Sequence, residues 1–184
     1  KSCFDLESTL FSGQVFRWQK FDDWYFGVIF DHVVKIKQID NTIEVYCDNA
    51  DDFFVLRLLS KYFNLDLNIN EIYNELPKDE FIQKPIKKYK GMRILKQDPW
   101  ECLVSFICSS VSNIKRISKN IEDLCINLGD NIHLGNYCRQ SFPNPQDIIY
   151  AGPELLRELK LGFRSEYIYQ SAKMIESGEI DLED

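Results

Sequence analysis

The sequence predicts an α+β protein in which an antiparallel β-sheet with covering helices is followed by a helical part. Short runs of β-branched and aromatic residues, separated by Asp and Asn, fill the chain up to about Tyr46, which is typical of strands and turns. From about Asp51 the apolar residues recur at helical spacing. Of the 184 residues, 45% are hydrophobic and 14% aromatic. The chain can therefore bury a core, which excludes a disordered chain.

Four strands are expected in the first part, after a strand-like opening. The segments 33–39 and 43–46 are joined across Asp40-Asn41, which predicts a hairpin with one covered face and one face in water. The opening is Ser2 to Leu6, and the expected strands are Phe16 to Trp18, Trp24 to Phe30, His32 to Lys37 and Thr42 to Tyr46.

Helices are expected from Asp51 onward. A second short helix should run from Asn70 to about Leu76. The segment from Lys84 to Lys96 carries six positive charges and no acid, and it is the one concentrated basic stretch. The first helix should end at Asn64 and bury one face made of Phe53, Phe54, Leu56, Leu58, Leu59, Tyr62 and Phe63.

The sharpest helix start in the sequence lies at Asp98. This side chain can cap the helix, Pro99 loses no hydrogen bond at the first helical position, and Glu101 can reach back as in a capping box. The residues up to Cys108 are apolar on nearly every side. The sequence therefore predicts a central buried helix of a bundle.

A polar turn, Ser109 to Asn113, should connect this helix to an amphipathic helix from Ile114 to Leu128 that ends at Gly129. Three further helices are expected, over Gln146 to Tyr150, Pro153 to Leu159 and Ser165 to Ser177.

We expect two domains, residues 1–83 with the sheet and residues 84–184 with the first helices of a helical domain. The chain begins with Lys1 instead of Met, and we expect it to be a piece of a longer chain. No run of 18 apolar residues is present, so no membrane span is expected.

Composition and spacing argue against several kinds of site. The six cysteines share no CxxC spacing, which argues against a zinc cluster or a disulfide scaffold and favours a reducing compartment. His32, in an expected strand, and His133, in an expected loop, leave little for a histidine metal centre or a catalytic triad. Cys108 has no sequence neighbour that would lower its pKa. The net charge of −7 argues against extensive contact with phosphates.

Two polar loops at helix ends carry arginine, Ser109 to Arg116 and Gly162-Phe163-Arg164. Such a loop presents backbone amides and a guanidinium on one surface. A helix hairpin with a solvated arginine is the simpler explanation of the loops by themselves.

Five separated motifs nevertheless resemble the 8-oxoguanine DNA glycosylase/AP lyases of the helix-hairpin-helix superfamily. They cover nearly the whole chain in the family's order, and the resemblance implies a TBP-like sheet domain followed by part of the glycosylase domain. The motifs are LFSGQVFRW from Leu10, YFNLD from Tyr62, GMRILKQDPWECL from Gly91, SFICSS from Ser105 and LGFRSEY from Leu161.

The resemblance implies base-excision DNA repair, in which oxidised guanine is flipped out of duplex DNA because its target atoms are inaccessible in the stack. In that family a lysine amine attacks the sugar C1′, its Schiff base undergoes β-elimination, and an aspartate supports the developing charge. Both residues follow a Leu-Pro-Gly-Val-Gly hairpin that this sequence lacks. The resemblance therefore places the catalytic residues beyond Asp184, implies an inactive isolated chain and requires no metal or organic cofactor.

The resemblance also assigns recognition residues. Gly13 matches the glycine whose carbonyl reads the N7–H of the oxidised base, and Phe106 matches an aromatic near the base pocket; a plain turn and an ordinary core residue are the simpler alternatives. Arg116 and Arg164 match two arginines that donate to the orphaned cytosine. Phe163 takes the place of an aromatic, usually tyrosine, that wedges into the base stack.

Val111-Ser112-Asn113 departs from the family, which typically has three asparagines there. The first asparagine fills the hole left by the flipped base and bonds the cytosine, whereas Val111 can only fill space. We therefore expect discrimination of the opposite base to be weaker by about 1–3 kcal/mol.

The expected partner is double-stranded DNA that contains 8-oxoguanine opposite cytosine, bound by a monomer that does not associate with membranes. The expected location is the cytoplasm, with the nucleoid, in a bacterium and the nucleus in a eukaryote. Two alternatives stay open: a non-catalytic DNA-binding or interaction module of the same fold, which Val111 favours, and a sibling glycosylase for another damaged base.

Overall fold

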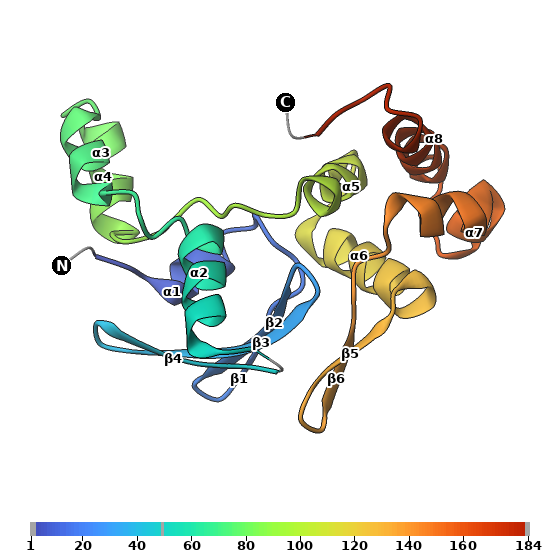
Figure 1. Cartoon of the computed structure of the whole chain (residues 1–184). Coiled ribbons are helices and arrows are strands. Elements are labelled where there is room, and N and C mark those ends of the chain that lie inside the picture. The colour runs from blue at the N-terminus through green and yellow to red at the C-terminus, as the bar shows by residue number, and fades with distance from the viewer. Residues whose placement is uncertain (1–2, 49, 183–184) are drawn as a thin grey trace. The chain divides into compact units, whose positions relative to one another are not determined.

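The computed structural model describes residues 3–48 and 50–182. The chain divides into two compact units, of which the first comprises Lys1–Gly27 and Val34–Lys96 and the second Val28–Val33 and Gln97–Asp184. Strands predominate in the first part of the chain and helices in the rest (Figure 1). The predicted α+β class is confirmed. The boundary expected between residues 83 and 84 stays a prediction.

The four strands of the main sheet follow one another in sequence order. They are β1 (Gln19–Phe21), β2 (Trp24–Ile29), β3 (His32–Ile39) and β4 (Thr42–Cys47). In the β3–β4 hairpin Ile39 pairs with Thr42 across the turn, and Asp40 takes the left-handed conformation with φ +50°, as tight hairpin turns require. The predicted hairpin across Asp40-Asn41 is therefore confirmed.

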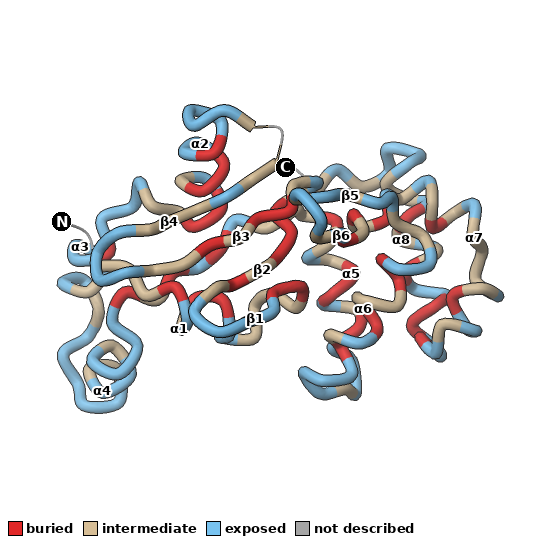
Figure 2. Tube along the Cα trace, turned by 90° about the horizontal axis from the view of Figure 1, so that it is seen from below, coloured by how far each residue is buried: buried red, intermediate tan, exposed pale blue. Residues whose placement is uncertain are grey.

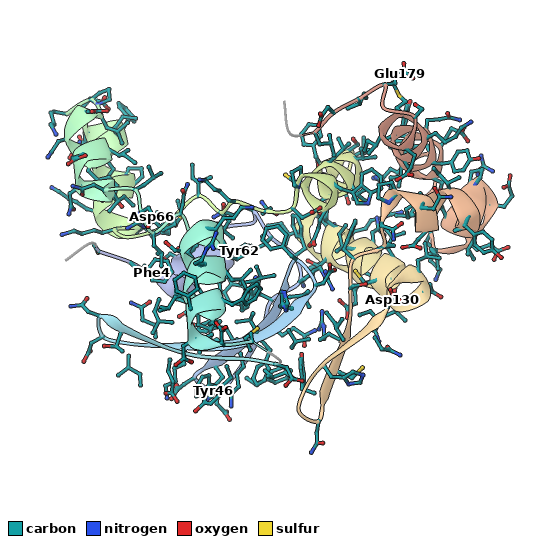
Figure 3. All side chains as sticks on the ribbon, viewed as in Figure 1. Phe4, Tyr46, Tyr62, Asp66, Asp130 and Glu179 are labelled. Carbon is teal, nitrogen blue, oxygen red and sulfur yellow. The ribbon has the colours of Figure 1, made fainter. Side chains whose placement is uncertain are left out.

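One face of the sheet is covered by helices and the other faces water, as predicted. The helices α1 (Leu6–Leu10) and α2 (Asp52–Tyr62) lie on the same face (Figure 1), and buried residues follow β2 and β3 (Figure 2). Tyr46 projects from the face opposite α2 (Figure 3). On this open face the Lys35 ammonium lies 4.1 Å from the centroid of the Trp24 ring.

The strand-like opening was a wrong prediction. Residues 3–5 have no regular structure and a five-residue helix, α1, begins at Leu6, while Ser2 lies outside the described residues. Distant partners stabilise this short helix, because the Leu6 N–H donates to Gln38 Oε1 at 2.8 Å and the Asp5 N–H donates to the Gly91 carbonyl at 3.0 Å. Such contacts leave no periodic signal in the sequence.

The strand expected at Phe16 to Trp18 is also absent from these three described residues, and β1 begins at Gln19. Trp18 is buried instead, and its indole N–H donates to the Tyr62 hydroxyl at 3.1 Å. A Cβ on Gly27 would lie 2.3 Å from the Trp18 ring, so only glycine leaves room for the ring at this position.

The buried face of α2 was predicted only in part. Phe53 and Leu56 are 69% and 66% exposed, and Phe54 is also exposed. The buried side chains of α2 are Val55, Leu58, Leu59 and Tyr62, which follow the i, i+3, i+4, i+7 spacing of one helical stripe.

Two helices follow α2 in the first unit, α3 (Ile69–Glu75) and α4 (Glu80–Lys88). The first corresponds to the helix expected from Asn70. The second begins inside the region before the basic stretch, where no helix was expected; Asp79 caps it by accepting from the Ile82 N–H at 3.0 Å. No residue within Glu80–Lys88 is buried, and the helix contains Pro85, a residue type that argues against a helix interior.

The second unit is mainly helical. Its elements are α5 (Pro99–Ser109), α6 (Ile114–Leu128), β5 (Asn131–Leu134), β6 (Tyr137–Gln140), α7 (Pro145–Glu158) and α8 (Arg164–Glu176). Fully buried residues from each of the four helices form its core: Val104, Ile121, Leu124, Ile148, Leu156 and Ile168. No helix within residues 3–48 or 50–182 is long and apolar enough to cross a bilayer.

Several predicted helix ends are confirmed in this unit. Asp98 caps α5 by accepting from the Glu101 N–H at 2.9 Å, and α6 has the predicted bounds. Gly129 follows α6 because a Cβ there would lie 2.1 Å from the Ser141 carbonyl oxygen. Gly152, with φ +74°, kinks α7 between the two helices that were expected there.

Two predictions for this unit were wrong. His133 belongs to strand β5 and pairs with Cys138 in β6, because a short hairpin turns at Gly135 with φ +57°. The helix α5 is not buried all round, since Phe106 is 74% exposed and Cys102 is also exposed. Its buried side is formed by Trp100, Val104, Ser105 and Cys108.

Candidate nucleic-acid interface

The turn between α5 and α6 exposes an apolar side chain on a strained backbone. Asn113 caps α6 by accepting from the Arg116 N–H at 3.0 Å. Before it, Val111 has φ +49° and is 92% exposed. A β-branched residue is rare in the left-handed region, and such strain costs on the order of 1–3 kcal/mol unless surrounding contacts enforce it. The turn therefore projects Val111 into solvent at an energetic cost.

Arg164, the first residue of α8, holds this turn from the protein side. It is only 3% exposed. Its Nη2 donates to the carbonyl oxygens of Ser110 and Val111, the latter at 3.2 Å, and its Nη1 donates to the Leu161 carbonyl at 3.4 Å. Among the described residues, Arg164 forms no ion pair. Its charge is therefore balanced by carbonyl dipoles instead of a carboxylate.

Two exposed aromatic residues flank the start of α8. Gly162 turns the chain into the helix with φ +62°, which a glycine adopts without strain. The rings of Phe163 and Tyr167 are 6.3 Å apart in an edge-to-face arrangement. The Arg164 guanidinium carbon lies 4.7 Å from the centroid of the Phe163 ring. One buried arginine therefore contacts both the Phe163 ring and the carbonyl oxygen of Val111.

We name the exposed side chains of Val111, Phe163 and Tyr167 the wedge surface. Arg116 is exposed on the first turn of α6, the helix that follows Val111 in the chain. The Arg116 guanidinium has no hydrogen-bond or ion-pair partner among residues 3–48 and 50–182, so it faces solvent. The turn and the start of α8 thus carry apolar and aromatic side chains, which suit contact with bases, and an accessible guanidinium, which suits contact with phosphates or base edges.

A buried polar layer lies beneath the turn. Burial raises the pKa of the Cys108 thiol to about 11, although the nearby Arg164 charge and the Asn120 side chain oppose this rise. The thiol is therefore protonated at neutral pH and is no nucleophile. Among the described residues, Ser112 Oγ, Asn120 Nδ2, Arg164 Nε and Ser165 Oγ are buried without a hydrogen-bond partner.

Gly13 lies in the first unit, in a turn that the hydrogen bonds of the Gln14 side chain fix. Its φ is +91°, and its carbonyl accepts no hydrogen bond from residues 3–48 or 50–182. The neighbouring Gln14 side chain donates to the Thr9 and Arg93 carbonyls at 3.2 and 2.8 Å. Its Oε1 accepts from the Leu95 N–H at 2.9 Å. The turn is therefore tied to the segment Arg93 to Leu95.

The structure thus brings most of the predicted site residues to one place in the second unit. These are Val111, Ser112, Asn113 and Arg116 at the α5–α6 turn and Phe163 and Arg164 at the start of α8. Ser112 is half-buried, Asn113 is a helix cap, and Arg164 faces inward. Phe106 lies on α5 with an exposed ring, and Gly13 belongs to the first unit. The role of each residue stays a prediction.

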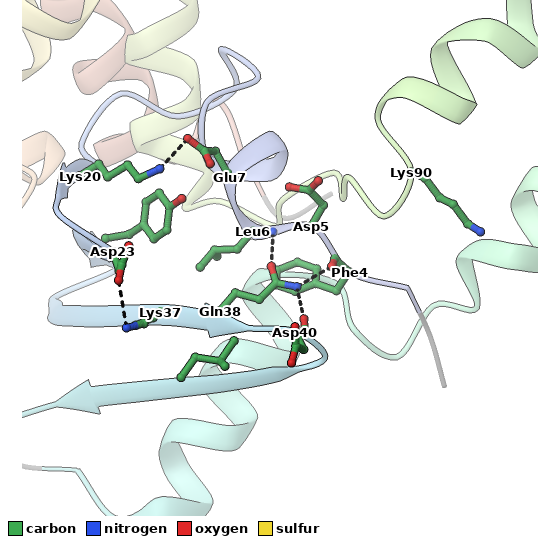
Figure 4. Close-up of a pocket in the computed structure, with 12 residues that line it drawn as sticks. Phe4, Asp5, Leu6, Glu7, Lys20, Asp23, Lys37, Gln38, Asp40 and Lys90 are labelled. Atoms are coloured by element: carbon green, nitrogen blue, oxygen red, sulfur yellow. Dashed lines mark hydrogen bonds and ion pairs between the residues drawn. The ribbon is translucent and has the colours of Figure 1, made fainter.

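An open cavity of about 690 Å³ in the first unit was not foreseen from the sequence. Four of its charged side chains pair with one another, Lys20 with Glu7 at 2.8 Å and Lys37 with Asp23 at 3.3 Å (Figure 4), and Asp5, Asp40 and Lys90 also line it. The pKa of Glu7 is lowered by its hydrogen bond from Lys20.

The sequence did not reveal two structural roles near the site. The Gln14 side chain, inside the motif from Leu10, connects its own turn to the distant residue Arg93 by donating to the Arg93 carbonyl. The Arg93 side chain in turn donates to the carbonyls of Asn64 and Leu67 at 3.1 and 2.7 Å. Pairing of one polar side chain with several distant backbone groups has no sequence period. The sequence offered one indication of the Gln14 role, which is that this polar residue stands among apolar residues in the motif from Leu10.

Comparison with known proteins shows which family the chain resembles. A family model described as 8-oxoguanine DNA glycosylase, N-terminal domain, matches residues 1–103. The chain is 33% identical to the N-glycosylase/DNA lyase of Saccharomyces cerevisiae, covering 95% of this chain and 50% of that protein. It is also 33% identical to the N-glycosylase/DNA lyase OGG1 of Arabidopsis thaliana, covering 89% and 46%. The chain thus spans about half the length of these curated relatives.

A solved structure points to the same family. The Clostridium acetobutylicum 8-oxoguanine glycosylase/lyase, in complex with dsDNA containing cytosine opposite to 8-oxoG, is 30% identical and superposes with a TM-score of 0.89. The match covers 98% of this chain and 62% of that chain. Since the family model spans more than half of the 184 residues, the chain belongs to the 8-oxoguanine DNA glycosylase family and carries its N-terminal domain.

Proposed function

We propose that this chain is the DNA-recognition part of a base-excision repair enzyme that flips 8-oxoguanine out of duplex DNA, cleaves its N-glycosidic bond and nicks the abasic strand by β-elimination. The observation that carries the proposal is the wedge surface on a rigidly held turn in a member of this family. Apolar side chains that enter a base step unstack and kink the duplex. Such distortion lowers the cost of extruding the damaged base.

On the strand opposite the lesion, Val111 fills the space that the flipped base leaves and Arg116 donates to the orphaned cytosine. The exposure of both side chains supports these roles. Phe163 enters the stack beside the lesion. Because Val111 offers no polar atom, the enzyme discriminates the opposite base less strongly than a protein with asparagine there, by about 1–3 kcal/mol. Cytosine opposite 8-oxoguanine is the proposed natural pairing.

On the lesion side, the Gly13 carbonyl accepts the N7–H of the oxidised base, and Phe106 lies near the base. A carbonyl with no donor among the described residues, in a turn fixed by Gln14, supports the first role. A preorganised acceptor loses little entropy on binding. The exposed ring of Phe106 supports the second role.

The excision chemistry belongs, in this proposal, to a lysine and an aspartate outside this chain, without a metal or an organic cofactor. The chain itself supplies recognition. We further propose that the protein acts as a monomer, in the cytoplasm with the nucleoid of a bacterium or in the nucleus of a eukaryote. Light scattering of the purified full-length protein tests the monomer.

Borohydride trapping of the full-length protein on an 8-oxoguanine:cytosine duplex tests the activity. We expect a covalent protein–DNA adduct, which forms only if an amine attacks the sugar. Phe163→Ala should lower trapping roughly tenfold at limiting protein, since one aromatic–base contact is worth about 1–3 kcal/mol. Tyr150→Ala, which removes an exposed aromatic of the same unit from α7, should leave it unchanged.

The same assay separates the alternatives. Lesion-specific binding without any trapped adduct would support a non-catalytic module and contradict the proposed activity. An adduct that forms only with another damaged base would instead identify a sibling glycosylase.

A further inference from the structure

The one concentrated basic stretch of the sequence, residues 84–96, lies in the first unit and is not part of the wedge surface. It carries six positive charges and no acid in a chain whose net charge is −7. Arg93 belongs to the core, where it is 3% exposed and donates to backbone carbonyls. Lys84, Lys87 and Lys88, in contrast, are exposed residues of α4. These three lysines therefore have no structural role of the kind that Arg93 has.

The three lysines share one side of α4. Lys87 and Lys88 follow Lys84 by three and four residues, and residues at these spacings are neighbours on a helix surface. Ile82 and Ile86, which are also four residues apart, are half-buried, so the other side of the helix faces the protein. We name Lys84, Lys87 and Lys88 the lysine stripe.

Little of the charge of the lysine stripe is neutralised. Lys84 approaches the Glu80 carboxylate at 4.0 Å, but the two side chains are 81% and 85% exposed, and such surface pairs are weak. Within residues 3–48 and 50–182, Lys87 and Lys88 form no ion pair. The Lys88 ammonium instead lies 5.1 Å from the centroid of the Tyr89 ring. The lysine stripe therefore presents positive charge to solvent.

Stability does not explain this clustering. Like charges at these spacings destabilise a helix, and α4 has no buried residue that would compensate. The helix dipole favours Lys87 and Lys88, which lie in the last turn, but it does not account for Lys84 in the middle of the helix. The pattern indicates an anionic ligand.

The backbone that carries the lysine stripe is fixed at both ends. Asp79 caps the start of α4 by accepting from the Ile82 N–H at 3.0 Å. After the helix, the Gly91 N–H donates to the Tyr73 hydroxyl at 2.9 Å, and the Gly91 carbonyl accepts from the Asp5 N–H at 3.0 Å. An anion that binds the stripe therefore needs to order only the lysine side chains, which keeps the entropic cost of binding low.

The dimensions of the lysine stripe fit a nucleic-acid backbone. From Lys84 to Lys88 the stripe spans about one helical turn, roughly 5.4 Å, and phosphates follow one another about every 3.4 Å of axis along one DNA strand. The flexible lysine side chains can therefore reach two or three successive phosphates. A lysine ammonium is a point charge without the planar fork that reads base edges, so such contacts carry no sequence information.

We infer that the lysine stripe of α4 binds the phosphate backbone of the duplex that flanks the lesion, as a non-specific DNA contact distinct from the wedge surface. The inference rests on the proposed function, which makes duplex DNA the anionic ligand of this protein. Because phosphates are alike in damaged and undamaged DNA, the stripe contributes equally to the binding of both.

The salt dependence of DNA binding by the full-length protein tests the lysine stripe. The triple variant Lys84→Gln, Lys87→Gln, Lys88→Gln is compared with the wild type on duplexes of about 40 base pairs, with and without 8-oxoguanine. We expect the slope of log K against log salt to fall in magnitude by about 2 to 3. At low salt the Kd should weaken at least roughly tenfold, by the same factor on both duplexes. An unchanged slope, or a loss confined to the damaged duplex, would overturn the inference.

A control variant separates the lysine stripe from the net charge of the protein. Replacing Lys20, Lys61 and Lys173, three exposed lysines of β1, α2 and α8, by Gln removes the same number of charges and should leave the slope unchanged. An equal fall in both triple variants would show that the net charge is responsible and would overturn the inference. Phe81→Lys tests the opposite direction. Phe81 is 90% exposed, three residues before Lys84, so a lysine there should increase the slope by about 0.9.

Duplex length tests the position of the contact. On a duplex of about 12 base pairs centred on 8-oxoguanine the flanks are absent, so the wild type and the stripe variant should bind with the same slope. A difference that persists on this short duplex would place the contact at the lesion and would contradict the inference. If the wild type binds damaged and undamaged duplexes equally, the proposed function fails, whereas the slopes on the undamaged duplex still decide whether the lysine stripe binds DNA.

Discussion

The Gln14 side-chain oxygen accepts a hydrogen bond from the backbone N–H of Leu95, 81 residues further along the chain, at 2.9 Å. The amide nitrogen of the same side chain donates to the carbonyls of Thr9 and Arg93. One side chain thus satisfies three backbone groups and ties the Gly13 turn to the end of the first unit. The conformation of this turn depends on long-range hydrogen bonds in addition to its glycine.

Gln14→Ala should lower the free energy of unfolding by about 2 kcal/mol, because it leaves one N–H and two carbonyls without their partner. Gln14→Glu should be at least as harmful, since it keeps the acceptor for Leu95 but turns a carboxylate oxygen toward two carbonyls. Urea unfolding followed by circular dichroism measures both. Gln83→Ala, which removes one surface hydrogen bond to Pro77, is the control. Equal losses of unfolding free energy for the Gln14 and Gln83 variants would contradict the role of Gln14 in fixing the turn.

Gly27→Ala should destabilise the protein by about 3 kcal/mol, because its Cβ would lie 2.3 Å from the Trp18 ring and the buried indole cannot yield freely. Gly135→Ala is the matched control. It has open space around the new Cβ but a φ of +57°, so only the backbone strain of about 1 kcal/mol applies. Thermal unfolding compares the two. A smaller loss for Gly27→Ala than for Gly135→Ala would contradict the packing account.

Cys108 should make stability fall at alkaline pH. Burial raises its pKa from 9.0 to about 11 in the folded protein, so the folded state holds this proton more tightly than the unfolded state. Its contribution is complete below pH 9.0 and is lost as the pH rises toward about 11. Between about pH 8 and about pH 10 the wild type should lose about 1 kcal/mol more than Cys108→Ala. Urea unfolding at both pH values measures this difference, and equal losses would show that the thiol is not desolvated.

Val111→Asn should increase the preference for cytosine opposite 8-oxoguanine roughly tenfold, because the amide restores one hydrogen bond to the orphaned base. Strand nicking of four duplexes by the full-length protein measures this preference. Ile126→Asn adds the same side chain at an exposed position near the end of α6 and should leave it unchanged. A wild type that already prefers cytosine as strongly as the Val111 variant would refute the assigned role of Val111.

Much of the fold was predictable because its signals are local. The helix α6 has the predicted bounds, since Asn113 is a capping residue and Gly129 follows its last turn. The β3–β4 hairpin was predictable from Asp40-Asn41 between two β-branched runs. In each case a residue determines the conformation of the backbone next to it, so the residue type alone predicts the local structure.

The remaining features depend on distant partners. The helix α1 needs Gln38 and Gly91, and its five residues are too few to show a helical period. The helix α4 contains Pro85, and because a proline argues against a helix interior, no helix was expected there. Arginine is usually exposed, and its type alone does not distinguish the buried Arg164 from the exposed Arg116. The site residues were found through motifs, whereas their environments required the structure.

The most direct test of the central claim is the equilibrium affinity of the full-length protein for two duplexes that differ only in 8-oxoguanine or guanine opposite cytosine, measured at the same salt concentration. Recognition through the Gly13 carbonyl and the wedge surface predicts at least roughly tenfold tighter binding of the damaged duplex, the value of one good base contact. Equal affinity for the two duplexes would contradict the assignment of this chain to lesion recognition.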